Sequence, residues 1–412
     1  MAGLKRRALL GATAAAGAGA LLPARRARAQ SPVLRLGVLS DMTGPYAEAS
    51  GPGDVVAVNL AVQDFAKLHP EIKVDVLSDD MLLKPDVGAS IARSWIDRDG
   101  VDVLLDMPQS AVALAVGGIV KEKDKLAIFT SAGVPDITGK YCSPNHIQWT
   151  YDLWANANGT ARALVAQRLD TWYFIIADYI SGHSMANDTA AIVKQMGGRE
   201  VGRVAYPFPG TTDFSSQLVQ AQASGAKVIC LANAGDDTVN CIKQANEFGI
   251  LKSGVKIGAL VFQDYQVHAL GLQTAQGLVC TLAQYWNQNA GTRTFADRFA
   301  PLYHNSKPNM FHAGAYSATW HCLKAVAAMG VDKAKASGRA IAEQMKAMPT
   351  DDPLYGQGRV RPDGKFVHKM YVCEVKSPAE SKEPWDYFKT LSTIPTEQAF
   401  KPMEAACPLV KA

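Results

Sequence analysis

The chain lacks the sequence patterns that mark most metal proteins and nucleotide-binding enzymes. None of its seven cysteines belongs to a CxxC pair, which excludes a zinc ribbon and a thioredoxin-type redox site. There is no GxxxxGK[ST] phosphate loop, and the only near match to GxGxxG, at Gly17 and Gly19, lies in the N-terminal segment that reads as an export signal. His304, His312 and His321 are eight and nine residues apart, which does not place two imidazoles one helical turn apart. We therefore expect no metal ion and no cofactor.

Charge and long apolar runs are also scarce outside the N-terminal segment. Charged residues make up 19% of the 412 residues, and the net charge is +4. Residues 1–30 contain six basic residues and no acidic one, so the remainder carries a net charge of −2. A mildly acidic body has no basic surface for nucleic acid, and we expect none as a partner. No later stretch reaches the ~18 apolar residues of a membrane-spanning helix.

The N-terminal segment has the pattern of an export signal. Lys5, Arg6 and Arg7 precede an Ala- and Gly-rich apolar stretch, and the small residues Ala27 and Ala29 mark a cleavage site. The weakly apolar stretch and the basic residues beside the cleavage site favour the twin-arginine route over the general secretory one. We predict a signal peptide over 1–29 and a mature protein in the periplasm. The alternative is an amphipathic helix that stays on the mature chain.

Short apolar runs alternate with helical periods along the first third of the chain. Strands are predicted at 33–40, 72–78, 101–107 and 126–130, and helices at 51–67, 85–98 and 110–122. Strands separated by helices of this length form βαβ units with a parallel sheet. The runs VDVLLDM and KLAIFT are almost continuously apolar, as expected for strands covered on both faces.

The same rhythm begins again after residue 150. Strands are predicted at 172–177, 200–206, 227–232 and 256–260, and helices at 153–168, 182–196, 214–223 and 236–248. Residues 293–348 read as purely helical, and 358–376 as a hairpin with a turn at Arg361–Gly364. The fold class is therefore α/β, with two doubly wound parallel-sheet lobes. No low-complexity linker separates them, which predicts chain crossings near 146–151 and 278–284.

Polar and glycine-rich segments follow the strands at matching places in both halves. In open parallel sheets, ligands bind at the carboxyl ends of strands, where helix N-termini also point. The segments are Asp41–Tyr46, Met107–Ser110 and Thr130–Gly133 in the first half, and Asp178–Gly182, Ala232–Asp236 and Phe262–Tyr265 in the second. Each single residue could be an ordinary helix cap or turn. Together they predict a neutral site for a carboxylate, with tyrosine faces for a ring or an alkyl chain.

One segment resembles a hydrolase motif. Gly182-His-Ser184-Met-Ala186 follows a strand and precedes a helix, like a nucleophile elbow, but its last residue is Ala. A polar loop at the start of a helix explains the same residues. A secreted hydrolase that uses Ser184 remains an alternative, and loss of ester turnover on Ser184→Ala would support it. We expect that the chain is not an enzyme.

Several segments together resemble the periplasmic substrate-binding proteins of ABC importers. They are LRLGVLSDMTGPYAEASGPG at 34–53, VDVLLDMPQSAVALAV at 101–116, TSAGVPDITGKYCSPNHIQWTYD at 130–152, ADYISGHSMANDTAAIVKQMGG at 177–198 and ANAGDDTVNCIKQANEFGI at 232–250. The resemblance is to the branched-chain amino acid-binding (type I) family, and the tail at 377–395 resembles its aromatic-acid-binding branch. It implies two lobes joined by three crossing strands, 31–150 plus 282–360 and 151–281 plus 361–412, that close on a small-molecule solute. It also implies a transient partner, the ABC permease of the inner membrane, and a monomeric receptor.

The resemblance also implies a ligand set. The first lobe would contribute Tyr46, Gln109, Ser110, Ser131 and Ala132, and the second Tyr151, Tyr179, Ser181, Asn233 and Phe262. Relatives that bind amino acids hold the ammonium group with an acid of the second lobe. Here that neighbourhood reads Phe262-Gln-Asp-Tyr265, and Gln109 stands where a small hydroxyl residue is usual. These departures favour a carboxylate with an uncharged, aromatic remainder, although Asp236 or Asp264 could hold an ammonium group.

Two further expectations follow from the resemblance. Cys142 and Cys407 lie in segments, CSPN and CPLV, that recur in the resembling branch, and we predict that they form a disulfide. An amino acid receptor of the same importer class and a ligand-sensing subunit of a signalling system remain alternative functions. Adjacent permease and ATPase genes would favour transport over sensing.

Overall fold

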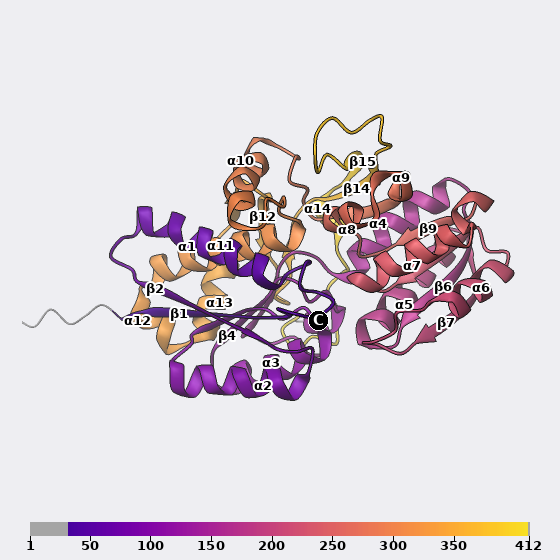
Figure 1. Cartoon of the computed structure of the whole chain (residues 1–412). Helices are drawn as coiled ribbons and strands as arrows, with labels where there is room; N and C mark the ends of the chain where they lie inside the picture. The colour runs from indigo at the N-terminus through magenta and orange to yellow at the C-terminus, as the bar shows by residue number, and fades with distance from the viewer. Residues whose placement is uncertain (1–31, 411–412) are drawn as a thin grey trace, which may run out of the picture. The chain divides into compact units, whose positions relative to one another are not determined.

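The structure, a computed structural model, describes residues 32–410, and the predicted signal peptide at 1–29 lies outside the described residues. Its first sheet is entirely parallel, in the strand order β2-β1-β3-β4-β5 (Figure 1). The strands are β1 (Leu34–Ser40), β2 (Val74–Asp80), β3 (Val103–Asp106), β4 (Leu126–Phe129) and β5 (His146–Gln148). The central strands β3 and β4 are buried at every residue, which explains their continuous apolar runs.

Two pairs of helices cover this first sheet. Helix α1 (Gly51–Leu68) packs beside α11 (Met310–Met329) on one face, and α2 (Pro85–Ser94) packs beside α3 (Ser110–Glu122) on the other (Figure 1). The last turns of α2 continue as a π-helix to Asp99. Helix α3 begins where Gln109 accepts a hydrogen bond from the Val112 N–H, so its start follows from a side-chain cap. We call this sheet and its helices the first lobe.

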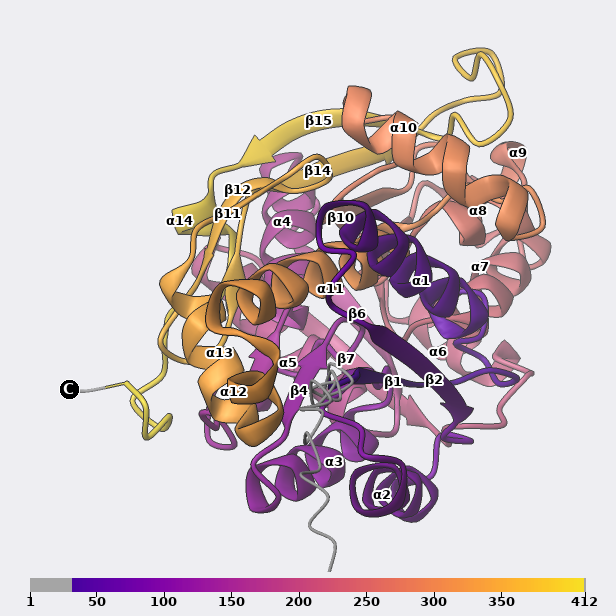
Figure 2. The same ribbon diagram turned by 90° about the vertical axis from the view of Figure 1, so that its left-hand side faces the viewer.

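The second sheet has the strand order β15-β14-β10-β9-β8-β6-β7. Its parallel strands are β6 (Thr171–Ala177), β7 (Arg199–Tyr206), β8 (Val228–Ala232), β9 (Lys256–Ala259) and β10 (Val279–Leu282), and its antiparallel strands are β14 (Met370–Val375) and β15 (Phe388–Ile394). Helix α4 (Leu153–Ala166) precedes β6, and the helices between the parallel strands are α5 (Ile180–Gln195), α6 (Ser215–Ala223), α7 (Asp236–Glu247), α8 (Asp264–Leu270) and α9 (Leu272–Ala275). Figure 2 shows α4 beside the antiparallel strands. This sheet and its helices form the second lobe, so the fold is α/β with two doubly wound lobes, as predicted.

The remaining elements correct one sequence-based expectation. Helices α10 (Ala290–Phe299), α12 (Val331–Ala336) and α13 (Gly338–Ala347) flank α11 in the predicted helical region, and strands β11 (Thr350–Asp352), β12 (Gly356–Val360) and β13 (Phe366–Val367) form a small antiparallel sheet. The predicted hairpin is confirmed at its turn, since β12 and β13 pair on either side of Arg361–Gly364. Its extension to residue 376 is wrong, because β14 pairs with β10 of the second sheet. The chain changes lobe at His368 and Lys369, between β13 and β14.

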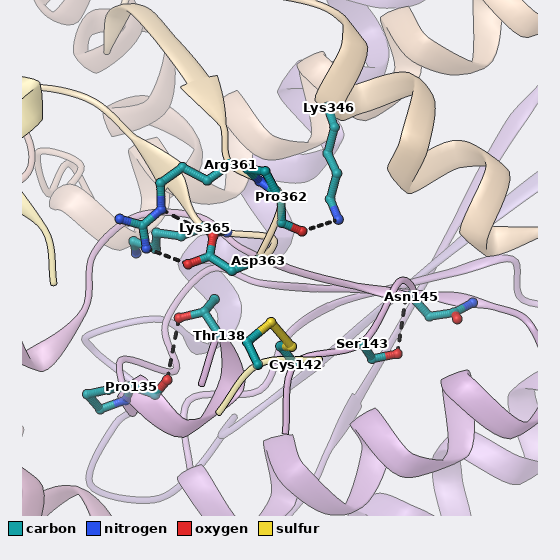
Figure 3. The surroundings of a disulfide bond; sticks show 11 residues. Pro135, Thr138, Cys142, Ser143, Asn145, Lys346, Arg361, Pro362, Asp363 and Lys365 are labelled. Carbon is teal, nitrogen blue, oxygen red and sulfur yellow. Dashed lines mark hydrogen bonds and ion pairs between the residues drawn. A yellow bond between two sulfur atoms is a disulfide. The ribbon is translucent and has the colours of Figure 1, made fainter. Parts of the chain in front are cut away.

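The chain's C-terminal segment contacts both lobes. Helix α14 (Thr396–Ala399) packs against α4, and the carbonyl of Gln398 accepts a hydrogen bond from Asn158. A disulfide joins Cys407 to Cys142 of the first lobe, next to the turn that carries Arg361 and Asp363 (Figure 3). That turn also lies against the first sheet, since the Gly364 carbonyl accepts from Gln148 N–H. The boundary expected at residue 360 therefore falls inside a segment that contacts the first lobe.

Candidate ligand-binding site

A cavity lies between the two lobes at the carboxyl ends of their parallel strands, where sheets of this type bind ligands. Its walls are aromatic, apolar and hydroxyl side chains together with glycines. The lining residues are Tyr46, Ala49, Pro108, Ser131, Gly133 and Phe311 of the first lobe, Tyr151 and Leu153 after the first crossing, and Tyr179, Ser181, Met185, Ala234, Gly235, Val261 and Tyr265 of the second lobe. Only about 20 Å³ is open to the centre of a water molecule. A ring-sized ligand therefore requires the walls to move apart.

Five of the residues expected from the sequence line this cavity. They are Tyr46, Ser131, Tyr151, Tyr179 and Ser181. They come together because each follows a parallel strand or a chain crossing, and such segments meet at one edge of the sheets.

Direct contacts join the lobes across the cavity. The Tyr46 hydroxyl donates to the Tyr179 hydroxyl at 3.0 Å, and the hydroxyls of Ser110 and Ser181 are hydrogen-bonded to each other. Phe208 stacks against Tyr179 with ring centroids 4.6 Å apart and lies 5.9 Å from the Tyr46 ring. Ser110, which does not itself line the cavity, is the first residue of α3, and Ser181 is the second residue of α5, so two helix N-termini face each other here.

The other expected residues have different surroundings. The side chain of Gln109 caps α3, and the Ala132 carbonyl accepts from the side chain of Gln148. Asn233 is buried and accepts from Thr238, while Phe262 lies in the core of the second lobe. None of these four side chains lines the cavity.

The two acids expected as ammonium partners do not line the cavity either. Asp236 is exposed at the start of α7. Asp264 is buried at the start of α8, where its Oδ1 accepts from the Tyr265 N–H at 3.1 Å. Burial raises the pKa of Asp264 to about 8. The cavity lining itself contains no Asp, Glu, Lys, Arg or His.

Sequence reasoning missed several lining residues. Tyr265 lies in a segment that the sequence singled out, but it was not selected from it. Phe311 is at the start of α11, 160 residues from Tyr151, and its ring lies 5.1 Å from the Tyr151 ring. Nothing local in the helical pattern of α11 marks Phe311. Gly133 is required because a Cβ there would lie 2.5 Å from the Tyr151 ring.

A pair of buried carboxyl groups lies behind Ser131. Asp54 of α1 and Asp106 at the end of β3 are fully buried, and burial together with the proximity of Asp106 raises the pKa of Asp54 well above its usual value. Burial also raises the pKa of Asp106. Asp106 and Met107 have φ angles of 83° and 59°, a conformation that non-glycine residues adopt at a cost and that is common at functional sites.

The structure also shows the surroundings of Ser184, the residue of the hydrolase alternative. Ser184 lies one turn inside α5, where its hydroxyl donates to Asp188, whereas the serine of a nucleophile elbow occupies the turn itself. Among residues 32–410, no group of three His, Cys, Asp or Glu side chains is placed to hold a metal ion. No helix in the described part of the chain is long and apolar enough to cross a membrane.

Comparison with known proteins identifies similar chains. A family profile described as "Periplasmic binding protein" matches residues 33–382. A periplasmic binding protein from Burkholderia mallei is 42% identical with a TM-score of 0.87, and the alignment covers 92% of this chain and 99% of that one. A branched chain amino acid ABC transporter periplasmic ligand-binding protein from Burkholderia xenovorans LB400 is 37% identical with a TM-score of 0.80, covering 90% and 99%.

A more distant structure shares the fold. It is the solute binding protein of an R. palustris ABC transporter in complex with 4-hydroxybenzoate, 20% identical with a TM-score of 0.78, covering 89% of this chain and 98% of that one. None of the curated proteins matches the chain significantly.

Proposed function

Because this chain belongs to the periplasmic binding protein family, we propose that it is the extracytoplasmic solute receptor of an ABC transporter. It binds a small organic carboxylate between its lobes, with an aromatic acid favoured, and delivers it to a permease. The observation that carries this proposal is the composition of the cavity, which combines aromatic rings with hydroxyl groups and contains no Asp, Glu, Lys, Arg or His in its lining.

The aromatic side chains suit a flat apolar ligand. Four tyrosines and Phe311 contribute to the walls, from both lobes. A ring that enters between them gains area burial and, for each well-placed aromatic neighbour, about 0.5–1.5 kcal/mol more. A ring in contact with Tyr46 and Tyr179 would touch both lobes at once.

The serines at the helix starts suit the carboxylate. A hydrogen-bonded pair of hydroxyls uses one proton between the two oxygens and leaves the other free to donate. Ser110 and Ser181 therefore retain one donor between them, next to the N-termini of α3 and α5. Charge-assisted hydrogen bonds and helix N-termini together can hold a carboxylate without an arginine.

Ligand-driven closure follows from the two-lobed wall. A solute that contacts both lobes binds the closed arrangement more tightly than the open one, and it shifts the population toward closure by that difference in affinity. A permease that recognises the closed arrangement can then distinguish loaded from unloaded receptor.

An amino acid receptor is the second candidate, favoured by the name of the 37%-identical protein from Burkholderia xenovorans. The cavity argues against it here, since an α-amino acid would place its ammonium group among tyrosines with no carboxylate in the lining. Burial of a charge without a partner costs several kcal/mol.

Calorimetric titration of the protein lacking residues 1–29 tests the proposal. We expect benzoate or cinnamate to bind at least about tenfold more tightly than leucine, a difference of ~1.4 kcal/mol. Tyr265→Ala should weaken benzoate binding, whereas Tyr141→Ala, at a half-exposed tyrosine outside the cavity lining, should not. Leucine binding as tight as that of the aromatic acids would replace the aromatic assignment by the amino acid one.

Cell experiments separate delivery from sensing. Deletion of the gene should abolish uptake of the acid that the purified protein binds, and re-expression should restore it. Unchanged uptake, with a changed transcriptional response to the same acid, would favour the sensing alternative.

A further inference from the structure

The hydroxyl of Ser131 directs its proton away from the cavity. Its Oγ donates to Oδ2 of Asp54 at 3.4 Å, and Asp106 lies within reach of the same hydroxyl. Because both protein acceptors belong to the buried carboxyl pair, the side of Ser131 Oγ that faces the cavity presents lone pairs.

The carboxyl pair keeps this orientation in place. Thr130 donates to Oδ1 of Asp106 at 3.3 Å, which leaves Oδ1 of Asp54 and Oδ2 of Asp106 buried without another partner among the described residues. One proton shared between these two oxygens satisfies both, as in other pairs of adjacent carboxyls. No ion pair in residues 32–410 includes either acid. The other oxygen of each acid then remains an acceptor, and these oxygens accept from the Ser131 and Thr130 hydroxyls.

The hydroxyl of Tyr151 also directs its proton away from the cavity. Its hydroxyl donates to the Ser131 carbonyl at 3.1 Å, and the phenol is held between Phe311 and the backbone of Gly133. A Tyr hydroxyl has a single proton, so its remaining hydrogen-bonding capacity is as an acceptor. Ser131 and Tyr151 thus line one corner of the cavity with two hydroxyl oxygens whose protons are engaged by protein acceptors and whose lone pairs remain to accept.

We propose that Ser131 and Tyr151 form an acceptor corner that selects solutes carrying an uncharged hydrogen-bond donor, such as a phenolic hydroxyl. The proposal rests on the proposed function and refines it from aromatic acids to hydroxylated aromatic acids. A solute that places a hydrogen-bond acceptor at this corner would bury it against the Ser131 and Tyr151 oxygens without a proton between them. Burial of such an unpaired polar group is costly. The same corner repels a carboxylate, which leaves the carboxylate to the Ser110–Ser181 side.

A set of matched ligands and variants tests the corner. The probes are 3- and 4-hydroxybenzoate, their fluoro analogues, which lack the donor, and unsubstituted benzoate. In calorimetry, at least one hydroxybenzoate should bind with an affinity at least about tenfold higher than that of its fluoro analogue. Ser131→Ala should reduce this ratio to within about twofold of one.

Thr130→Val is the matched control. It removes a hydroxyl that contacts the same carboxyl pair but does not line the cavity, so the hydroxy-to-fluoro ratio should persist. Thermal melts verify that both variants fold. Two results would overturn the acceptor corner and leave the proposed function intact. In the first, the unmodified protein binds benzoate but binds each hydroxybenzoate and its fluoro analogue with nearly equal affinity. In the second, the preference for the hydroxybenzoate persists in Ser131→Ala. Absence of binding by every aromatic acid overturns the proposed function and the corner with it.

Discussion

Replacement of Asp264 by Asn should stabilise the protein in a pH-dependent manner. The side chain is buried at the start of α8, and among the described residues its hydrogen-bond partner is the Tyr265 N–H, which an Asn oxygen can also accept. No basic residue forms an ion pair with it in residues 32–410. Burial raises the pKa of this carboxyl from 3.8 to about 8. Asn has nearly the same shape and stays neutral.

The magnitude follows from proton linkage. Between pH 4 and 8 the folded protein keeps a proton on Asp264 that the unfolded chain has lost, so the folded state binds more protons and stability falls as the pH rises. The contribution is fully present below pH 4 and is lost as the pH passes the folded pKa of about 8. At about 1.4 kcal/mol per pH unit, the free energy of unfolding of Asp264→Asn exceeds that of the native protein by ~4 kcal/mol at pH 7 and by ~5–6 kcal/mol above pH 8.

Urea denaturation at pH 5, 6, 7 and 8 measures this gain. The free energy of unfolding of Asp264→Asn minus that of the native protein should rise steadily over this range and level off above pH 8. Groups that titrate in both proteins cancel in the difference. Asp351→Asn, which removes an exposed carboxylate, should show no such slope. A difference that is independent of pH would refute the reasoning, because it would mean that Asp264 remains ionised in the folded protein.

Two further predictions concern the ends of the chain. Peptide mapping without reduction should recover Cys142 linked to Cys407, and Cys142→Ser should lower the unfolding free energy by roughly 2–5 kcal/mol, since the bond closes a loop of 265 residues; free thiols at both positions would contradict the pairing. Replacement of Arg6 and Arg7 by Lys should abolish accumulation of the folded protein in the periplasm, measured by fractionation, because the weak apolar stretch favours the twin-arginine route. Unchanged export would indicate the general secretory route.

Sequence alone determined the fold class and most element positions. Alternation of apolar strands with helical periods is a local property of the chain, and a buried parallel strand needs apolar residues on both faces. Helix α3 occupies 110–122 as predicted, because Gln109 caps it locally. The extension of the predicted hairpin to residue 376 is wrong because the pairing of its last strand is not a local property. Strand β14 pairs with β10, some ninety residues earlier, and nothing in its own sequence distinguishes that partner from its neighbour β12.

For the candidate site too, the sequence identifies some of the residues, and the tertiary structure decides their roles. Residues such as Tyr46 and Tyr179 could be selected from the sequence because βαβ topology brings every strand's carboxyl end to one edge. Their hydrogen-bonding roles could not, because the direction of a hydroxyl proton depends on what lies behind it. Ser131 is an acceptor toward the cavity only because α1 places Asp54 behind it. Asp264 follows the expected strand, yet its side chain is buried outside the cavity lining, and only the packing of α8 decides that.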